Sequence, residues 1–257
     1  TVAKDSPVWS LIVFYLPRSL EVMFISMGLA IGFGVIFGKM TAKKVNSFRD
    51  YTIRIFMYII LSIPGFVIII YFVLLYINTP FKIFPLYGYK TVYYPDPTFI
   101  TGFPLIDSLL AREWAIFLDL IWHLIVPVSA MTIIQMVAII RQTRSSLIEV
   151  LRMDFIRTAK AKGCSDRKIM NKHAMKLAIP PVITISAMGF PIVMGGMIAV
   201  EVAYHFVGIG YMFRMAVIER DYIVFITIVF LFSVIVIIVN FITDIIIGFL
   251  DPRIRLK

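Results

Sequence analysis

The sequence has one cysteine, three histidines and few charged side chains. Cys164 cannot form an intrachain disulfide, and it has no second cysteine with which to hold a metal cluster. Only 16% of the 257 residues are charged, whereas 60% are hydrophobic, and the mean hydropathy is +0.93. A soluble domain needs more polar cover than this, so the composition favours an integral membrane protein.

Catalytic and nucleotide-binding motifs are also missing from the sequence. It contains no Ser/His/Asp arrangement, no paired carboxylates, no HExxH motif and no GxxxxGK[ST] phosphate loop. We therefore expect a non-enzymatic chain with no metal or cofactor of its own. The net charge of +10 would suit nucleic acid on a soluble surface, but the basic residues lie between hydrophobic stretches, so no nucleic-acid partner is expected.

Long apolar stretches are what the sequence does have. They cover residues 19–38, 55–77, 115–140, 177–200 and 223–250. A helix of about 20 residues rises roughly 30 Å, which is the thickness of the hydrocarbon core. Pro64 and Gly65 predict a kink in the second stretch, and Pro180, Pro181 and Pro191 predict breaks in the fourth. The predicted fold class is an all-α, polytopic membrane protein with five transmembrane helices.

The distribution of basic residues predicts the orientation of these helices. Segments 39–54, 141–176 and 251–257 together hold 18 of the 25 Lys and Arg, which places them in the cytoplasm by the positive-inside rule. Segment 78–113, rich in Pro, Tyr and Phe, is then an external loop. The first residue lies outside and the C-terminus inside, so we expect one further helix upstream, making six in the full chain.

The most polar long segment, residues 154–181, is patterned as two helices around a glycine. Residues 154–162 begin with an acid and end with bases, which suits the helix dipole. Gly163 is placed to stop that helix, and Ser165 to cap a second helix from Asp166. The expected apolar face of the second helix comprises Ile169, Met170, His173 and Leu177. Such a protrusion predicts docking into a partner's groove, the alternative being an amphipathic hairpin on anionic headgroups.

Ionisable residues within the apolar stretches offer a different function, because such groups are costly in lipid and often form proton relays. The candidates are Glu21, Asp119, His123, Glu201 and Asp244. Most lie near the ends of predicted spans, which favours ordinary contact with water. Asp119 and His123 are four residues apart, but no third ligand accompanies them, so no metal site is predicted.

At this polar segment the chain resembles the transmembrane subunits of ABC importers, whose cytoplasmic signature is Glu-Ala-Ala, three residues and Gly. Arg157, Thr158, Ala159 and Gly163 occupy that frame, although the Glu is absent and the Pro expected soon after Met175 comes later, at Pro180. The dipeptide/oligopeptide branch is similar over most of the chain. The matching motifs are SIPGF (62–66), FPLYGY (84–89), HLIVP (123–127), RQTRSSLIEVLRMDFIRTAKAKG (141–163), VGIG (207–210), RDY (220–222) and LDPRIR (250–255).

This resemblance implies a type I ABC importer transmembrane domain over 1–257, of the first-permease type, with a coupling loop at 154–177. Such a subunit lies in the cytoplasmic (inner) membrane and forms half of a pathway for di- or oligopeptides. Oligosaccharides, nickel chelates and an ion-coupled secondary transporter remain alternatives. The implied partners are a second permease, two ATPase subunits that bind ATP and Mg, and an external substrate-binding protein. The residues implied in ATPase coupling are Arg157, Thr158, Ala159, Lys160, Gly163, Ser165 and Asp166.

Overall fold

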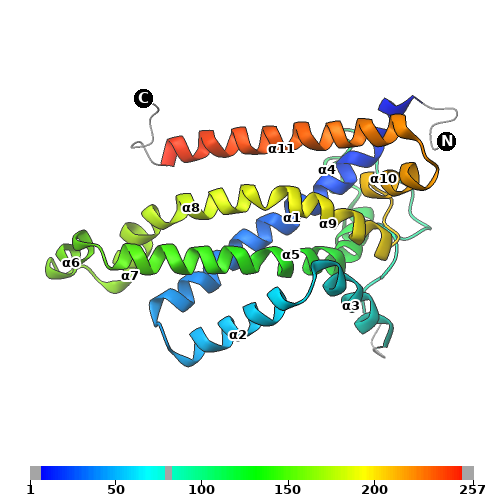
Figure 1. The fold of residues 1–257 in the computed structure, drawn as a ribbon. Coiled ribbons are helices and arrows are strands. Elements are labelled where there is room, and N and C mark those ends of the chain that lie inside the picture. The colour runs from blue at the N-terminus through cyan, green and yellow to red at the C-terminus, as the bar shows by residue number, and fades with distance from the viewer. Residues whose placement is uncertain (1–6, 79–82, 251–257) are drawn as a thin grey trace. The chain divides into compact units, whose positions relative to one another are not determined.

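The computed structural model describes residues 7–78 and 83–250, and the regular structure in those ranges is helical (Figure 1). The helices are α1 (Val8–Lys43), α2 (Phe48–Ser62), α3 (Gly65–Asn78), α4 (Pro104–Leu110), α5 (Trp114–Leu151), α6 (Asp154–Ala161), α7 (Asp166–Lys168), the π-helical turn η1 (Ile169–Ala174), α8 (Met175–Met188), α9 (Phe190–Ala203), α10 (Ile209–Ile218) and α11 (Tyr222–Leu250). The predicted basic tail at 251–257 lies outside the described residues.

The long helices account for the predicted membrane spans. Three of them, α1, α5 and α11, are each long and apolar enough to cross a bilayer. The count rises to five if α2 with α3, and α7–α8 with α9, each form one interrupted span. The all-α, multi-pass prediction is therefore confirmed, but the helices are longer than predicted. In particular, α5 continues past Ile140 to Leu151, and the first basic segment shrinks to a short link between Lys43 and Phe48.

Proline has different effects in the two interrupted spans. As predicted, α2 ends before Pro64, and the Pro64 carbonyl accepts the first bonds of α3, from the amides of Val67 (2.9 Å) and Ile68 (3.3 Å). The prediction that Pro180 and Pro181 break the fourth span is wrong, because both lie inside α8. A proline there removes an amide donor but has a helical φ, so the helix can continue. The interruption falls instead at Gly189, two residues before Pro191.

The chain forms two compact units, which we describe separately. The first comprises Thr1–Met27, Ile63–Ile134 and Ile192–Val234. One of its cores brings together side chains from α1, α10 and α11. This core contains Ile12, Ile209, Met212, Ala216, Val224 and Ile228. It holds the short helix α10 against the membrane-spanning helices α1 and α11.

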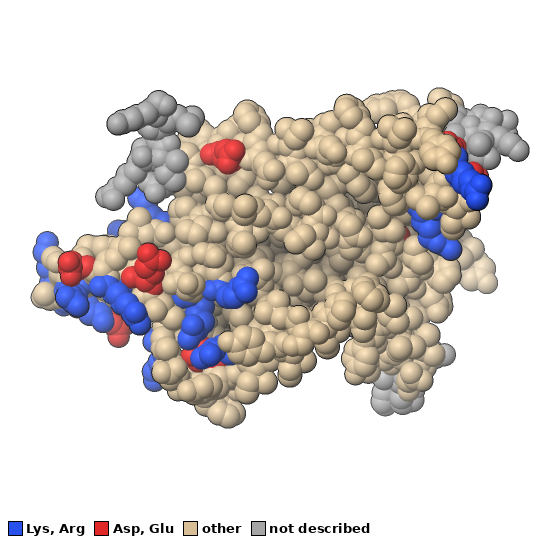
Figure 2. Space-filling model, viewed as in Figure 1, with Lys and Arg blue, Asp and Glu red and all other residues tan. Residues whose placement is uncertain are grey.

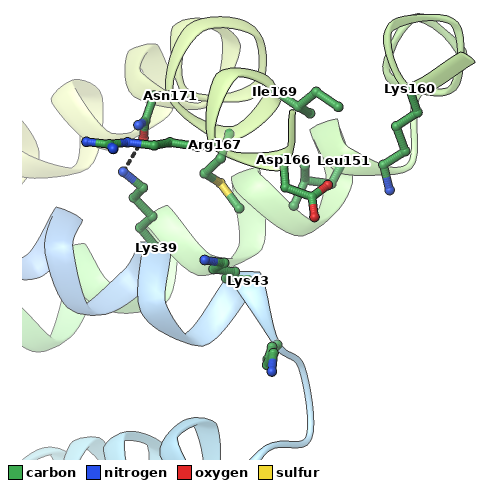
Figure 3. A pocket seen from close by; sticks show the side chains of 10 residues that line it. Lys39, Lys43, Leu151, Lys160, Asp166, Arg167, Ile169 and Asn171 are labelled. Carbon is green, nitrogen blue, oxygen red and sulfur yellow. Dashed lines mark hydrogen bonds between the residues drawn. The ribbon is translucent and has the colours of Figure 1, made fainter. Parts of the chain in front are cut away.

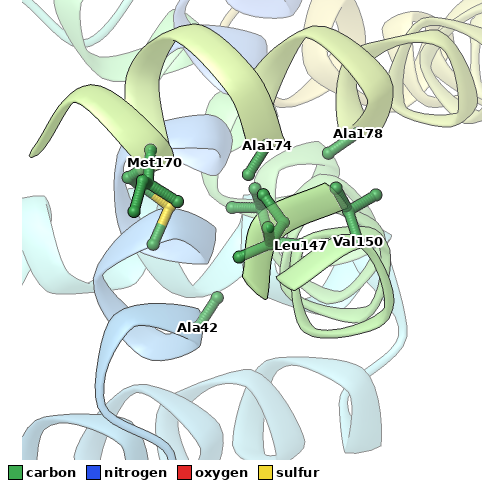
Figure 4. Close-up of a cluster of buried hydrophobic side chains, with 8 residues drawn as sticks. Ala42, Leu147, Val150, Met170, Ala174 and Ala178 are labelled. Atoms are coloured by element: carbon green, nitrogen blue, oxygen red, sulfur yellow. The ribbon is translucent and has the colours of Figure 1, made fainter. Parts of the chain in front are cut away.

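The second unit comprises Gly28–Ser62, Gln135–Pro191 and Ile235–Lys257. Its core lies where the polar segment meets the ends of α1 and α5 (Figure 4). The buried side chains are Ala42, Leu147, Val150, Ile156, Ile169, Met170, Ala174 and Ala178. The polar segment is thus anchored on the helices it connects.

A buried ion pair joins α2 to α5 within the second unit. The side chain of Asp50 is fully buried, and Arg144 binds both of its oxygens, with Nε–Oδ1 and Nη2–Oδ2 distances of 3.0 and 3.1 Å. The amide of Asn46 donates a third bond, of 2.9 Å. A buried carboxylate is costly unless it is paired and hydrogen-bonded. These bonds therefore fix the start of α2 against α5.

Replacing Arg144 by Met should destabilise the protein by about 3 kcal/mol, because it leaves the Asp50 carboxylate buried without its counter-charge. The measurement is thermal or denaturant unfolding of the purified protein in mild detergent. Arg141→Met is the matched control, since Arg141 is exposed three residues earlier on the same helix. Equal stability of the two variants would show that the ion pair contributes nothing.

The segment between α3 and α5 contains a carboxylate-centred turn. Asp107 of α4 is 2% exposed. It accepts bonds from the amides of Thr101 (2.7 Å) and Gly102 (2.9 Å) and from the Thr101 hydroxyl (2.6 Å). Burial favours the neutral acid, but these donors outweigh it and hold the pKa of Asp107 below its ordinary value.

A lowered pKa makes this contribution to stability dependent on pH. The unfolded carboxyl titrates near pH 4, so the stabilisation is fully present above that pH and is lost as the pH falls through the lower, folded-state pKa. We expect Asp107→Asn to lower the free energy of unfolding by about 1–3 kcal/mol at pH 7. Its deficit should shrink below pH 4 in melts of both proteins. A deficit independent of pH would contradict the charged state assigned to Asp107.

Candidate functional site

The predicted stop at Gly163 is present and has a defined hydrogen-bond pattern. Gly163 has a φ of +78°, in the left-handed region that favours glycine. Its amide donates to the Lys160 carbonyl (2.9 Å), and the Cys164 amide donates to the Ala159 carbonyl (3.1 Å). These two bonds form a Schellman motif, which satisfies carbonyls that a helix end otherwise leaves open. The α6 helix therefore ends in a rigid, hydrogen-bonded turn.

The predicted cap of the second helix is also confirmed. The Ser165 hydroxyl accepts a bond from the Lys168 amide at 3.4 Å, and Ser165 itself has extended backbone angles. This is the geometry of an N-terminal serine cap. Helix, glycine turn and capped helix thus follow one another as the sequence predicts.

The predicted apolar face of this second helix is partly wrong. Ile169 and Met170 are buried as expected, but His173 is only half-buried and Leu177 is 43% exposed. A π-helical turn over Ile169–Ala174 explains the difference. Each π-helical turn takes more residues than an α-helical one, so the face in contact shifts by one position. The buried residues that follow are Ala174 and Ala178, which pack against α5 residues Leu147 and Val150.

The seven residues assigned to coupling lie together on this loop, and nearly all face outward. Ala159 is half-buried against the core cluster, whereas the others are exposed. The Arg157 side chain is 80% exposed, and its contact with Asp154, 94% exposed, spans 3.4 Å. Figure 2 shows Lys and Arg side chains gathered over α6 and α7. The basic helix α6 thus ends in a hydrogen-bonded turn and is anchored to the core by Ile156, which is 1% exposed.

Glu201 is placed differently from the prediction. The sequence favours contact with water for acids near the ends of predicted spans, but Glu201 lies in α9 and is fully buried. Its carboxylate accepts a 2.5 Å bond from the Ser19 hydroxyl and a 2.6 Å bond from the Tyr211 amide. Ser19 in turn accepts from the Ile209 amide at 2.8 Å. This cluster ties α1, α9 and α10 together, and the only sequence signal was an acid shortly before a Gly-x-Gly turn.

The other candidate relay residues have separate local partners. Glu21 accepts a bond from the Leu105 amide (2.9 Å). Asp119 accepts from the Thr91 amide (2.7 Å) and hydroxyl (2.6 Å), and the His123 ring lies 2.8 Å from the Asp119 carbonyl. Asp244 is exposed on α11. Within residues 7–78 and 83–250, no three His, Cys, Asp or Glu residues are grouped as metal ligands.

The glycines beside Glu201 are required by close packing, which gives a direct test of the cluster. A Cβ on Gly210 would lie 2.9 Å from the Ile198 Cα, whereas one on Gly195 would meet nothing within 4 Å. We expect Gly210→Ala to destabilise the protein by about 1–3 kcal/mol through overpacking. Gly195→Ala should have little effect on the same thermal unfolding measurement. A Gly210→Ala protein as stable as the control would mean that the α9–α10 contact is loose.

These features together define a multi-pass α-helical membrane protein with an exposed, basic helix–glycine–helix loop. Residues 30–256 match the family model described as "Binding-protein-dependent transport system inner membrane component". The chain belongs to this family, and it is therefore a multi-pass component of the inner membrane.

Two bacterial relatives illustrate the match across the chain. The sequence is 35% identical over 255 residues to the oligopeptide transport system permease protein AppB of Bacillus subtilis, covering 99% of this chain and 74% of that protein. It is 34% identical over 253 residues to the di/tripeptide transport system permease protein DppB of Pseudomonas aeruginosa, covering 96% and 73%. These similarities confirm the resemblance to peptide permeases that the sequence motifs indicated.

The fold matches a solved transporter. An inward-facing structure of the MetNI methionine ABC transporter superposes with a TM-score of 0.69 at 15% identity, covering 96% of this chain and 99% of the matched chain. At that identity the match shows the fold alone. It confirms the type I ABC importer permease fold predicted from the sequence.

Proposed function

We propose that this chain is a permease subunit of an ATP-driven importer and forms half of a membrane pathway for di- or oligopeptides. The observation that carries the proposal is the exposed α6–Gly163–α7 loop, set in a chain that matches peptide permeases over almost its whole length. The peptide substrate is inferred from the relatives, whose names specify oligopeptides and di/tripeptides.

The loop is suited to receive force from an ATPase. Its outward residues Arg157, Thr158 and Lys160 offer charged and polar contacts, while Ile156 is buried in the core that also contains Leu147 of α5. A push on α6 would therefore act on α5 through packed side chains and not through a free loop. We assign coupling to the seven predicted residues on this basis, with Gly163 setting the angle at which α6 ends.

The remaining subunits follow from this role. We propose a second, related permease, two cytoplasmic ATPase subunits and an external substrate-binding protein. ATP and Mg would be bound by the ATPases, leaving this chain a non-catalytic subunit without a cofactor. The apolar outer surface of α11, with exposed Ile237, Phe241 and Phe249, suits contact with lipid chains or with the second permease.

We also propose the orientation that the basic residues indicate. The α6–α7 loop and the C-terminus would face the cytoplasm, and the segment around α4 would face outward. The supporting observation is the concentration of Lys and Arg in segments 39–54, 141–176 and 251–257. Modification of single introduced cysteines by a membrane-impermeant reagent, in whole cells and in inverted vesicles, tests this assignment.

Gly163 provides the test of coupling. Gly163→Val should abolish most ATP-dependent peptide uptake, because a β-branched residue is strained at a φ of +78° and the α6 turn must rearrange. Gly163→Asn is the matched control, since Asn tolerates left-handed angles and should retain most uptake. A Cβ at Gly163 meets nothing within 4 Å, so neither variant should disturb packing.

The measurements are uptake of a labelled dipeptide by reconstituted complex, ATPase activity, and thermal unfolding of the permease. Uncoupling predicts lost uptake with an intact membrane fold. Normal uptake by Gly163→Val would contradict the coupling role. Uptake of a maltooligosaccharide or a nickel chelate in place of the peptide would retain the permease assignment and change its substrate, and uptake without ATP would favour a secondary transporter.

A further inference from the structure

A cavity of about 560 Å³ lies in the second unit beside the loop (Figure 3). Its lining is strongly basic. The cationic side chains are Lys39, Lys43, Lys44, Lys160 and Arg167, and the single acid is Asp166. Lysines of the basic segment 39–54 and basic residues of the coupling loop thus line the same cavity. Like charges gathered around one cavity repel one another, so the cavity favours an anion that neutralises them.

We propose that this cavity binds a phosphate-bearing anion, either the headgroup of an anionic phospholipid or a soluble phosphate. Phosphate oxygens accept several charge-assisted hydrogen bonds at once, and Arg167 presents a forked donor suited to them. Lys39 donates to the Asn171 side chain, which leaves two further ammonium protons available. In Figure 3, Arg167 lies next to this pair, with Asp166 set apart near Leu151.

Part of the lining of the cavity is apolar. It is formed by Leu151, Ile169 and Met170, of which Ile169 is 2% and Met170 7% exposed. Exposed cations beside apolar side chains match a ligand that carries a phosphate on a less polar body.

The position of the cavity along α1 lets either a lipid headgroup or a soluble phosphate reach it. Lys39 and Lys43 follow Gly38, the end of the first apolar stretch, by roughly 2 and 8 Å along α1 at 1.5 Å per residue. The headgroup layer of one leaflet is about 5–7 Å thick. With the hydrocarbon boundary at Gly38, as the hydropathy predicts, Lys39 falls at headgroup depth and Lys43 at the aqueous edge of the headgroup layer. An anion bound there would link α1 to α6 through Lys160 and to α7 through Arg167.

The test measures binding by the purified full-length permease and does not depend on transport. The protein is placed in nanodiscs of phosphatidylcholine with or without phosphatidylglycerol, and retained lipid is counted by native mass spectrometry. Inorganic phosphate is then added as the soluble competitor. Lys43→Gln/Lys44→Gln should lower the retention of phosphatidylglycerol by at least about tenfold. Lys172→Gln/Lys176→Gln is the matched control, removing two exposed charges outside the cavity.

Each outcome decides the proposal or its source of phosphate. Retention of phosphatidylglycerol that millimolar phosphate cannot displace identifies the lipid as the ligand. Direct binding of inorganic phosphate that is lost in the Lys43/Lys44 variant identifies a soluble ligand. Equal losses in both double variants would show a diffuse basic surface, and would overturn the proposal. It also fails if neither probe binds, or if zero-length cross-linking in the assembled complex joins Lys43 or Lys44 to an ATPase carboxylate.

Discussion

Backbone amides and carbonyls in hydrocarbon have no water to bond, and most of this structure follows from that constraint. It requires continuous helices wherever the chain crosses the apolar layer, which α1, α5 and α11 provide. It also explains why the interruptions at Pro64 and Gly189 are short. Directly after the first interruption, the Pro64 carbonyl accepts bonds from the amides of Val67 and Ile68. Irregular structure of greater length occurs between α3 and α5 and between α9 and α11, around α4 and α10.

The same constraint applies to charged side chains that leave water. Asp50 and Glu201 are fully buried, and each is surrounded by donors from separate parts of the chain. A buried carboxyl group that accepts hydrogen bonds from two or three helices holds those helices at fixed positions, since moving any one would leave a buried polar group without its partners. Asp50 and Glu201 therefore fix the positions of neighbouring helices, each within its own unit. Three of the candidate relay acids, Glu21, Asp119 and Glu201, have such local bonds.

The loop from α6 to α8 combines an exposed surface with a buried base. Its Schellman turn and serine cap bond the backbone groups at the helix ends. Ile156, Ile169 and Ala174 bury it against α5 and the end of α1. A surface that must transmit displacement needs this combination, because a mobile loop would absorb the motion. The basic cavity beside the loop is lined by exposed residues of the loop, such as Lys160, and by its buried residue Ile169. An anion bound there would therefore act on the element that we propose for coupling.

The sequence by itself determined the helical membrane class, the approximate spans, the Gly163 stop and the Ser165 cap, because these depend on hydrophobic length and on local backbone chemistry. Residue-level resemblance also determined the family. Only the tertiary structure decided which side chains of the second loop helix are buried, since a π-helical turn is set by packing against α5 and leaves no periodic signal. The partners of Asp50 and Glu201, and the meeting of Lys39 with Arg167, likewise join residues more than a hundred positions apart or on separate helices. Such contacts depend on how helices pack, and no local pattern in one stretch of chain records them.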